Sequence, residues 1–472
     1  MAIINARSPY FVSITDANIS YSTLEIYIYS GAKTATVTAE YNLQKSKIGT
    51  STKVSFEISE LIRDYLDVTF DGNYDTTAAY EGSAKWVKTI IKAFNSVGTQ
   101  VGSTVTETNI ALDGYSYFEE GSSFTMSDKS LFKSDGDIFL PKFGDSNIAI
   151  YTENNPTVLL LDSAGATVDT STFATSVNSD EQIKYVSLYP ELITNLGFDD
   201  SSDWNLRAGD IIEKGQLYFG GATGGRFPTT FTPTTGTNYI LNFTITESIS
   251  GNFSVFPGDG GASIISNVSE VGDYSIQYTQ TSTLENKVVF FSTLGFDGAM
   301  DNVSVKEVYD VASISVTDDN GTTKENVEQV KECKFKPHKI TFINKNGVLD
   351  DMYFFKKSSN SMTTKRESYN ANTIKADNTY SINQHNKIDF NITANSTVKL
   401  SSGFLNESTN EIFKQLLLSE RVWITRTFEN SELVLPINIK TSSISYKTSL
   451  NDRLVEYSID FDDSYESINN IR

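Results

Sequence analysis

The feature of this sequence that most constrains its fold is an alternation of apolar and polar residues over short runs. In the run Leu24–Tyr29, the aliphatic residues would occupy one face of a strand, and Glu25, Tyr27 and Tyr29 the other. A period of two is typical of a half-buried β-strand. The same pattern recurs near the C-terminus, in 455–461. We therefore predict a mostly β protein, built from several β-sandwich domains with one or two short helices.

The composition of the chain agrees with this prediction. Among the 472 residues there are 24 Tyr and 29 Phe but only 5 Met, a balance that suits sheets and loops better than helices. A chain of this length corresponds to roughly three domains at about 150 residues each. It is long enough to bury several separate hydrophobic cores.

The charge of the chain argues against direct nucleic-acid binding. Its 38 Lys and Arg residues face 59 Asp and Glu residues, which gives a formal net charge of −21. Binding to phosphate backbones requires a concentrated positive surface. Basic runs here do not exceed pairs such as Lys356-Lys357 and Lys365-Arg366. We expect the acidic excess to favour solubility at high local concentration.

The sequence also indicates the cellular compartment in which the chain folds. Its single cysteine, Cys333, excludes an intrachain disulfide, and the start of the sequence lacks the basic and apolar regions of a signal peptide. No stretch of about 18 apolar residues could span a bilayer. We therefore expect folding in a reducing cytosol and no membrane span.

Composition and strand patterns divide the chain into four predicted domains. An N-terminal β-sandwich covers 1–122, with strands near 35–43, 53–57, 86–95 and 104–112 and a helix over 58–66. A second, discontinuous β domain combines 123–190 with 308–330. Between its two parts lies an insertion over 191–307 that is rich in Gly, Ser, Thr and Phe. A C-terminal β-rich domain covers 331–472.

Two local signals in the flanking domains are specific enough to be tested. The sequence Asp318-Asp-Asn-Gly321 after an alternating strand predicts a hairpin turn. In the C-terminal domain, the spacing of Ser408 and Glu411 predicts a capping box at the start of a helix over 409–418. Its apolar stripe would be Ile412, Phe413, Leu416 and Leu417.

The insertion carries two motifs at a domain-like separation. It opens with 191–200, which contains Asn-Leu-Gly-Phe-Asp and is followed by Trp204, and it closes with Met-Asp301-Asn-Val-Ser-Val. Their order resembles the galactose-binding-like jelly rolls of carbohydrate-binding modules. The resemblance covers about a quarter of the chain, residues 191–307. It implies an inserted jelly-roll domain.

The same resemblance implies a metal site and a sugar site. Asp199 and Asp301 would be the carboxylate ligands of a structural Ca²⁺, with backbone carbonyls completing the oxygen shell. The alternative is that both carboxylates make ordinary turn hydrogen bonds. No other cofactor is expected.

Glycan binding by the insertion would need aromatic faces for stacking and polar groups for hydroxyls. The candidates by residue type are Trp204, Tyr218, Arg226, Phe227, Tyr239, Phe253 and Phe256. The alternative is a decorative or stabilising domain, in which Trp204 is a core residue and Tyr239 and Phe253 face inward.

The flanking domains resemble structural tail proteins of tailed bacteriophages. The resemblance lies in the blocks 330–357 and 413–424 and in the opening Ala6-Arg-Ser-Pro-Tyr10. It implies a virion tail, baseplate or tail-fibre-associated subunit that is assembled in the host cytoplasm. Its partners would be other tail proteins and copies of itself. The insertion would be displayed towards the host surface and would bind a cell-surface glycan there.

Catalysis has little support in the sequence. Only His338 and His385 are present, and neither belongs to a nucleophile motif with Cys333. The glycine-rich run 220–225 lacks the Gly-Lys-Ser/Thr ending of a phosphate loop, so we expect a loop between strands. We predict a non-enzymatic virion protein. The alternatives are a non-viral glycan-binding or adhesin protein and a polysaccharide depolymerase with paired carboxylates.

Overall fold

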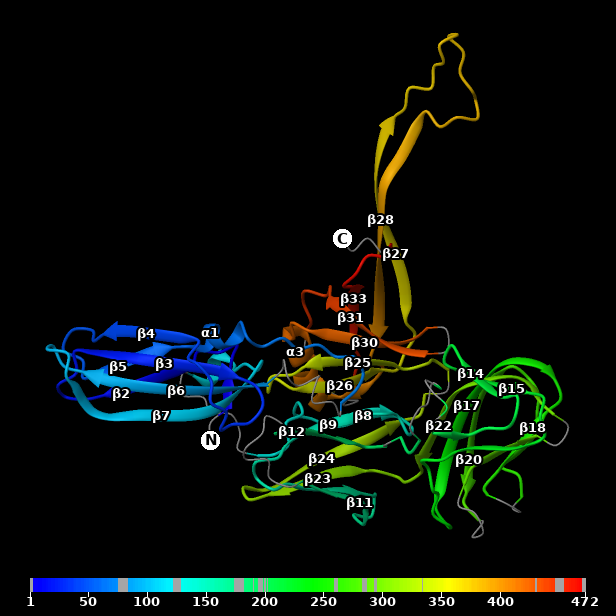
Figure 1. Cartoon of the computed structure of the whole chain (residues 1–472), viewed down its shortest axis with the longest axis horizontal. Helices are drawn as coiled ribbons and strands as arrows, with labels where there is room; N and C mark the ends of the chain where they lie inside the picture. The colour runs from blue at the N-terminus through cyan, green and yellow to red at the C-terminus, as the bar shows by residue number, and fades with distance from the viewer. Residues whose placement is uncertain are drawn as a thin grey trace.

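The computed structural model of the chain describes residues 3–74, 84–121, 129–173, 182–189, 191–193, 198, 201, 203–258, 262–281, 287–292, 295–332, 334–428, 431–445 and 454–468. The described chain is 52% strand and 5% helix, arranged in several sheets, which confirms the predicted fold class. Figure 1 shows an elongated body with an N-terminal unit at one end, the insertion at the other, and a narrow arm rising between them. No helix within these ranges is long and apolar enough to cross a membrane.

The N-terminal unit is a five-stranded sheet covered by a two-stranded one. The larger sheet has the order β1 (Ile3–Asn5), β7 (Gln100–Leu112), β6 (Ala84–Phe94), β3 (Tyr21–Tyr29) and β4 (Tyr41–Ser46). The smaller pairs β2 (Phe11–Thr15) with β5 (Lys53–Glu57). In β3, Leu24 and Ile26 are buried while Glu25 and Tyr27 are half-buried, as the alternation predicts.

Two elements of this unit are shorter in the structure than the sequence predicts. The strand expected over 35–43 begins only at Tyr41. The helix expected over 58–66 is α1 (Ser59–Arg63), because the chain tightens after Arg63. The N–H of Tyr65 donates to the carbonyl of Ile62, and that of Leu66 to the carbonyl of Arg63, an i→i+3 pattern that ends an α-helix.

The second unit joins segments from both sides of the insertion in one sheet. Its order is β11 (Thr167–Thr172), β10 (Thr157–Leu161), β23 (Ser313–Asp318), β24 (Gly321–Val330) and β8 (Ile138–Pro141). β9 (Asn147–Tyr151) and β12 (Ile183–Ser187) form a separate antiparallel pair. The register pairs Asp318 with Gly321, which confirms the predicted hairpin turn.

The chain enters and leaves the insertion at one place. The rings of Tyr189 and Tyr309 stack at 5.3 Å between centroids. The Tyr189 hydroxyl donates to the carbonyl of Tyr309, and the Tyr309 hydroxyl donates to the carbonyl of Leu188. Residues 120 positions apart are therefore held side by side, which is the geometry that an inserted domain requires.

The insertion is a sandwich of two five-stranded sheets. One sheet has the order β13 (Trp204–Asn205), β16 (Gly224–Pro228), β21 (Val289–Ser292), β18 (Phe253–Phe256) and β19 (Ile265–Val268). The other has the order β14 (Ile211–Glu213), β15 (Gln216–Gly220), β22 (Asp297–Glu307), β17 (Asn238–Ser250) and β20 (Gly272–Thr279). Aromatic side chains fill the space between them, among them Phe219, Phe243, Phe253, Phe290 and Phe296.

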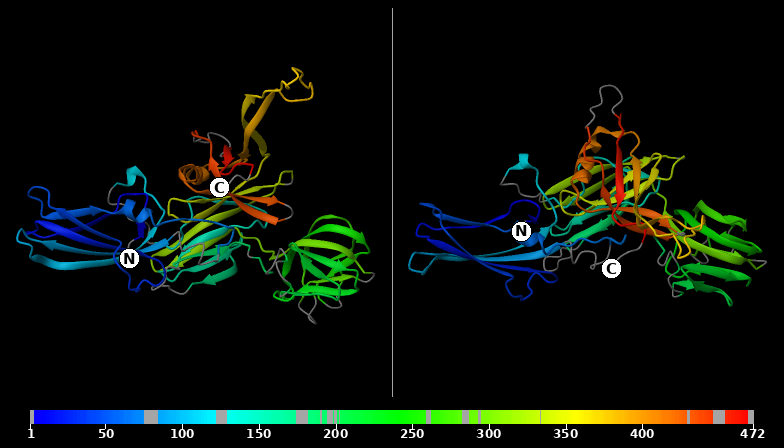
Figure 2. Two further views of the ribbon diagram at one scale, coloured as in Figure 1. Left: turned by 45° about the horizontal axis from the view of Figure 1, so that its top comes forward. Right: turned by 90° about the horizontal axis from the view of Figure 1, so that it is seen from above.

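The C-terminal unit is built on a seven-stranded sheet. Its order is β26 (Leu349–Phe354), β25 (His338–Ile343), β30 (Val422–Phe428), β31 (Ser431–Ile439), β33 (Ser458–Asp463), β28 (Lys387–Ser401) and β27 (Ser359–Asn370). A small pair, β29 (Leu405–Asn406) and β32 (Leu454–Val455), lies beside it. The paired strands β27 and β28 continue far beyond the sheet and form the arm (Figures 1 and 2).

The helix of this unit, α3 (Asn410–Leu418), packs as predicted but begins differently. Phe413 and Leu416 are fully buried, as the stripe predicts. The capping box is wrong, because no side chain caps the helix. The Ser408 hydroxyl donates to Asp137, and Glu411 accepts a hydrogen bond from the Tyr117 hydroxyl. Contacts with other units of the chain use the side chains that the local motif would have used.

Candidate functional site

Four of the seven predicted sugar-binding residues lie in the core of the insertion. Trp204, Arg226, Tyr239 and Phe253 are almost fully buried. Trp204 packs against Phe198 and Phe290, and Phe253 lies among the core phenylalanines. The structure corrects the prediction for these four residues, because no sugar can reach them from solvent.

Arg226 is buried for a specific reason. Its guanidinium makes a two-point ion pair with Asp210, with Nε–Oδ2 and Nη2–Oδ1 distances of 2.7 and 2.8 Å. It also donates to the carbonyls of Ala222 and Gly224 and lies over the ring of Phe219. The glycine-rich run 220–225 thus contains the loop 221–223 between β15 and β16, as expected, and the carbonyls of Ala222 and Gly224 accept from a buried cation.

The remaining aromatic candidates Phe227 and Phe256 lie on the outer face of the sheet that contains β16, β21 and β18. The strand registers pair Phe256 with Val289, and Phe227 follows Arg226, which is paired with Phe290. One row across the three strands holds Gly225, Phe291 and Ser254. Phe227, Phe256 and Phe291 are each half-buried, so part of each side chain is exposed to solvent. We call this surface the aromatic face.

A glycine makes room for two side chains of the aromatic face. A Cβ at Gly225 would come within 2.5 Å of Cγ1 of Val289 and 3.5 Å of Cδ2 of Phe291. Without that atom the two side chains can lie across β16. The rings of Phe256 and Phe291 pack edge-to-face with their centroids 6.2 Å apart, a favourable aromatic geometry.

Polar groups border the aromatic face. Nζ of Lys287 lies 4.1 Å from the centre of the Phe227 ring, a cation–π contact. Asn205 is exposed directly opposite Phe227 in the neighbouring strand. Ser254 follows on the other side, where its hydroxyl accepts from the N–H of Asn267. An aromatic platform with amide, hydroxyl and ammonium groups at its edges suits a ligand with apolar ring faces and peripheral hydroxyls.

Tyr218 does not belong to this surface. It lies on β15, in the opposite sheet, between the buried residues Leu217 and Phe219. Its side chain is half-buried and points out of the other side of the sandwich. Sequence reasoning therefore grouped residues that the fold places on two faces, and it missed Phe291 and Lys287. The apolar run Val288–Phe291 indicated a strand, but only the strand register shows which of its rings lies on the outer face.

The predicted calcium ligands can be checked only in part, because Asp199 lies outside the described residues. Asp301 is buried, and its Oδ1 accepts a hydrogen bond from the N–H of Asn302 at 2.7 Å. Burial raises the pKa of Asp301 above its usual value. Among the described residues, no group of three or more His, Cys, Asp or Glu side chains could hold a metal.

The calcium site stays a prediction with a direct measurement. If Asp199 and Asp301 bind Ca²⁺, the melting temperature of the insertion should be higher in Ca²⁺ than in EDTA, since a ligand that binds only the folded state stabilises it. In Asp301→Asn that difference should disappear. Equal melting temperatures of the parent protein in the two buffers would contradict the site.

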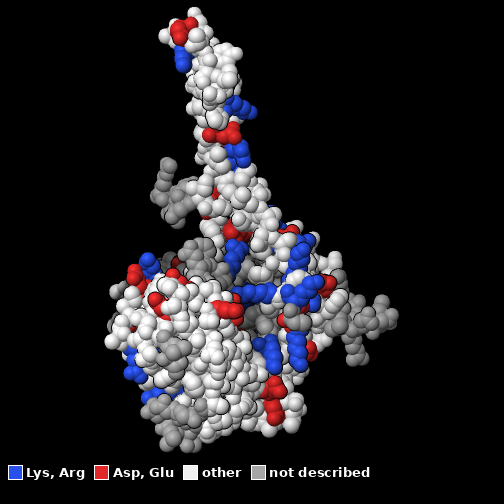
Figure 3. Space-filling view, turned by 90° about the vertical axis from the view of Figure 1, so that its right-hand side faces the viewer, with Lys and Arg blue, Asp and Glu red and all other residues white. Residues whose placement is uncertain are grey.

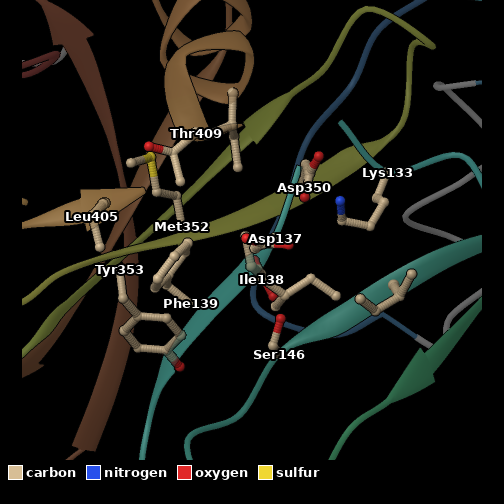
Figure 4. A pocket seen from close by; sticks show the side chains of 13 residues that line it. Lys133, Asp137, Ile138, Phe139, Ser146, Asp350, Met352, Tyr353, Leu405 and Thr409 are labelled. Atoms are coloured by element: carbon tan, nitrogen blue, oxygen red, sulfur yellow. The ribbon is translucent and has the colours of Figure 1, made fainter. Parts of the chain in front are cut away.

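A second candidate site is a small cavity between the second and C-terminal units (Figure 4). Asp350 and Lys133 face it, and Oδ2 of Asp350 accepts from the N–H of Ser134 at 2.7 Å. Burial raises the pKa of Asp350, although Lys133 opposes the shift. The cavity has a volume of about 20 Å³, enough for one water molecule but not for a sugar ring. Its polar groups join the two units.

A third candidate is a cleft of about 1010 Å³ where the units meet. Lys and Arg side chains gather around a hollow on this side of the molecule (Figure 3). Two of the cations that line the cleft are in ion pairs: Lys339 with Asp145 and Asp351, and Arg426 with Asp463. These pairs offset the charge of Lys339 and Arg426, while Lys306 and Lys336 also line the cleft.

The two histidines lie in unrelated places. Nε2 of His338 is 3.1 Å from the Ser358 hydroxyl, and burial, together with Arg426 and Lys336, lowers the pKa of this imidazole. His385 is exposed in the loop between β27 and β28. Cys333 lies outside the described residues. The two imidazoles therefore do not form one site.

Comparison with known proteins adds little. No family model and no curated protein matches the sequence. A weakly similar solved structure is SGBP-B of the Bacteroides ovatus mixed-linkage glucan utilization locus, in complex with a mixed-linkage heptasaccharide. It shows 13% identity and a TM-score of 0.16, covering 65% of this chain and 74% of that one.

Two further solved structures are similarly distant. The M60 catalytic domain with the CBM51-1 and CBM51-2 domains from Clostridium perfringens ZmpB shows 8% identity and a TM-score of 0.18, covering 96% of this chain and 52% of that one. The native conformation of E. coli alpha-2-macroglobulin shows 8% identity and a TM-score of 0.16, covering 97% of this chain and 39% of that one. TM-scores this low carry no argument about the fold or the function of this chain.

Proposed function

We propose that this chain is a binding protein whose inserted sandwich recognises a glycan through the aromatic face. The observation that carries the proposal is the arrangement of Phe227, Phe256 and Phe291 on one outer surface bordered by polar groups. Rings of pyranose size present apolar C–H faces that can stack on such a surface. Asn205, Lys287 and Ser254 are placed at the edges, where sugar hydroxyls would lie.

The proposal is tested on the full chain with a glycan array, followed by calorimetric titration of the best ligand. In Phe291→Ala we expect affinity to fall about five- to tenfold, since losing a stacked aromatic ring removes roughly 1–1.5 kcal/mol of binding free energy. Tyr218→Ala, on the opposite face, is the matched control and should bind as the parent does. A parent protein that binds no glycan on the array, or equal losses in both variants, would refute the proposal.

A second candidate function is a structural subunit of a larger particle, such as the tail of a bacteriophage. The observation that favours it is the arm, which extends beyond the body with exposed apolar side chains (Figure 1). Such a subunit would use the arm for assembly and display the insertion to a host glycan. A non-viral glycan-binding protein would use the same sugar site, so the two hypotheses differ in whether the chain assembles.

A further inference from the structure

The arm is the free part of the β27–β28 hairpin, residues 362–396, beyond the pairs that β28 makes with β33. Every residue of β27 is exposed. Among the described strands, β27 is the edge of its sheet and pairs only with β28. An isolated two-stranded hairpin is marginally stable in water, and its unpaired edges invite another chain.

The outer half of the arm is amphipathic. Tyr369 lies opposite Ile388, and Glu367 lies opposite Phe390, so these four side chains share one face. The Tyr369 and Phe390 rings touch edge-to-face with their centroids 5.6 Å apart. On the other face, Arg366 forms an ion pair with Asp389. One side of the arm is therefore mainly apolar and the other charged, the pattern of a sheet that buries one side.

The apolar side is uncovered in a single chain. Tyr369 is 51% exposed and Phe390 is 45% exposed. The loop beyond them adds Ile374, Tyr380 and Ile382, all of which are exposed. An apolar surface of this kind, concentrated at one end of a projecting element, marks an interaction site.

The charge distribution indicates what covers this surface. The arm carries four cationic and three anionic side chains and is nearly neutral, whereas the whole chain carries a net charge of −21. Two copies that met through their bodies would repel each other. Two arms can meet away from both bodies, because the arm projects from the rest of the molecule (Figures 1 and 2).

We propose that two copies of this chain associate through their arms, with the Tyr369–Phe390 face of one arm packed on the same face of its partner. Such an interface is isologous, the commonest form of homodimer contact. It gives the particle-subunit hypothesis its first assembly contact and does not depend on glycan binding. A chain that fails to bind sugar can still dimerise, and a monomer can still bind sugar.

The first test is the mass of the full chain in solution, measured by light scattering over a range of concentrations. We expect a dimer of the 52.2 kDa chain at high concentration. The double variant Tyr369→Lys, Phe390→Lys should remain monomeric. The control Ser368→Lys, Asn370→Lys adds the same charge to the opposite face and should still dimerise. A monomeric parent protein, or equal loss of dimer in both variants, would overturn the inference.

A cross-linking experiment separates arm–arm contact from an arm that docks on the partner's body. In a Cys333→Ser background, Tyr369→Cys should give covalent dimers with a short bis-maleimide, and Ser368→Cys should give several-fold fewer. A dimer that is lost in the lysine variant but does not cross-link through Tyr369→Cys would overturn arm–arm packing. An unchanged melting temperature shows that the variants fold. If the double lysine variant has a lowered melting temperature, the double variant Tyr369→Ser, Phe390→Ser takes its place.

Discussion

Replacing Arg226 with Met is expected to destabilise the inserted domain by about 3–5 kcal/mol, because it leaves the Asp210 carboxylate buried without its cation. Both side chains of the pair are fully excluded from solvent. The guanidinium also satisfies carbonyls of the glycine-rich loop, and the Asp210 carboxylate accepts from the N–H groups of Arg207 and Gly220. Losing Arg226 therefore loosens the loop as well as the ion pair.

Hydrogen exchange of amides within 203–307 is the appropriate measurement, since unfolding of a chain with several domains is not a single two-state transition. We expect faster exchange across the insertion and unchanged exchange in the N-terminal unit. Lys214→Met removes an exposed cation from the same domain and serves as the control. Adding Asp210→Leu to Arg226→Met should recover part of the loss, because no unpaired charge then remains. Equal exchange in Arg226→Met and Lys214→Met would contradict the role assigned to the pair.

The same pair makes the insertion sensitive to acid. Burial alone would raise the pKa of Asp210, but the hydrogen bonds from Arg226, Arg207 and Gly220 lower it further than burial raises it. A carboxyl group whose pKa is lowered by folding stabilises the protein above its ordinary pKa, near 3.8, and loses that contribution as the pH falls through the folded value. We expect protection of the insertion to decline below pH of about 4 in the parent protein. In the Asp210→Leu, Arg226→Met variant this decline should be smaller.

The sequence could predict strands and the fold class because both depend on local patterns. In Leu24–Tyr29 and Asp318–Gly321, neighbouring residues alone are enough to predict a strand and a turn. The arm was not predicted, although Ile388, Phe390 and Ile392 alternate with polar residues, because a local pattern does not show that two paired strands project beyond the body. Ser408 and Glu411 have the spacing of a capping box, but Asp137 and Tyr117, far away in the chain, bind them instead.

The candidate site was predictable by residue type and not by residue position. Phe227 and Phe256 are suitable rings that happen to lie on the outer face. Arg226 is a suitable cation that lies in the core, because its partner Asp210 is sixteen positions away and only the fold brings the two together. Charged residues are rarely buried unless they are paired. Because the sequence does not show that Asp210 pairs with Arg226, it predicts Arg226 at the surface.

Replacing Lys339 with Met is the second change with a large expected effect, and it acts at the junction of three units. Nζ of Lys339 lies 3.1 Å from Asp351 and 3.2 Å from Asp145. The Tyr74 hydroxyl, from the N-terminal unit, donates to the other oxygen of Asp351. Without the ammonium, two carboxylates would remain close together and partly buried. We expect a loss of about 3–5 kcal/mol, seen as a lower melting temperature and as weaker docking of the units.

The control for this variant is Lys440→Met, which removes a half-exposed cation paired with Asp462 in the same C-terminal unit and should change stability by less than about 1 kcal/mol. Alkaline pH gives an independent test. Burial lowers the pKa of Lys339, but Asp351, Tyr74 and Asp145 raise it further, to well above 10.5. Burial and Asp351 raise the pKa of Tyr74 well above 10.0.

Both groups therefore stabilise the fold in their protonated forms. Their contribution is complete below a pH of about 10, where the unfolded groups begin to lose protons, and it disappears as the pH rises through the folded values. We expect the melting temperature of the parent protein to fall above that pH and that of Lys339→Met to fall less. A parent and a variant with the same alkaline profile would show that this cluster does not hold the three units together.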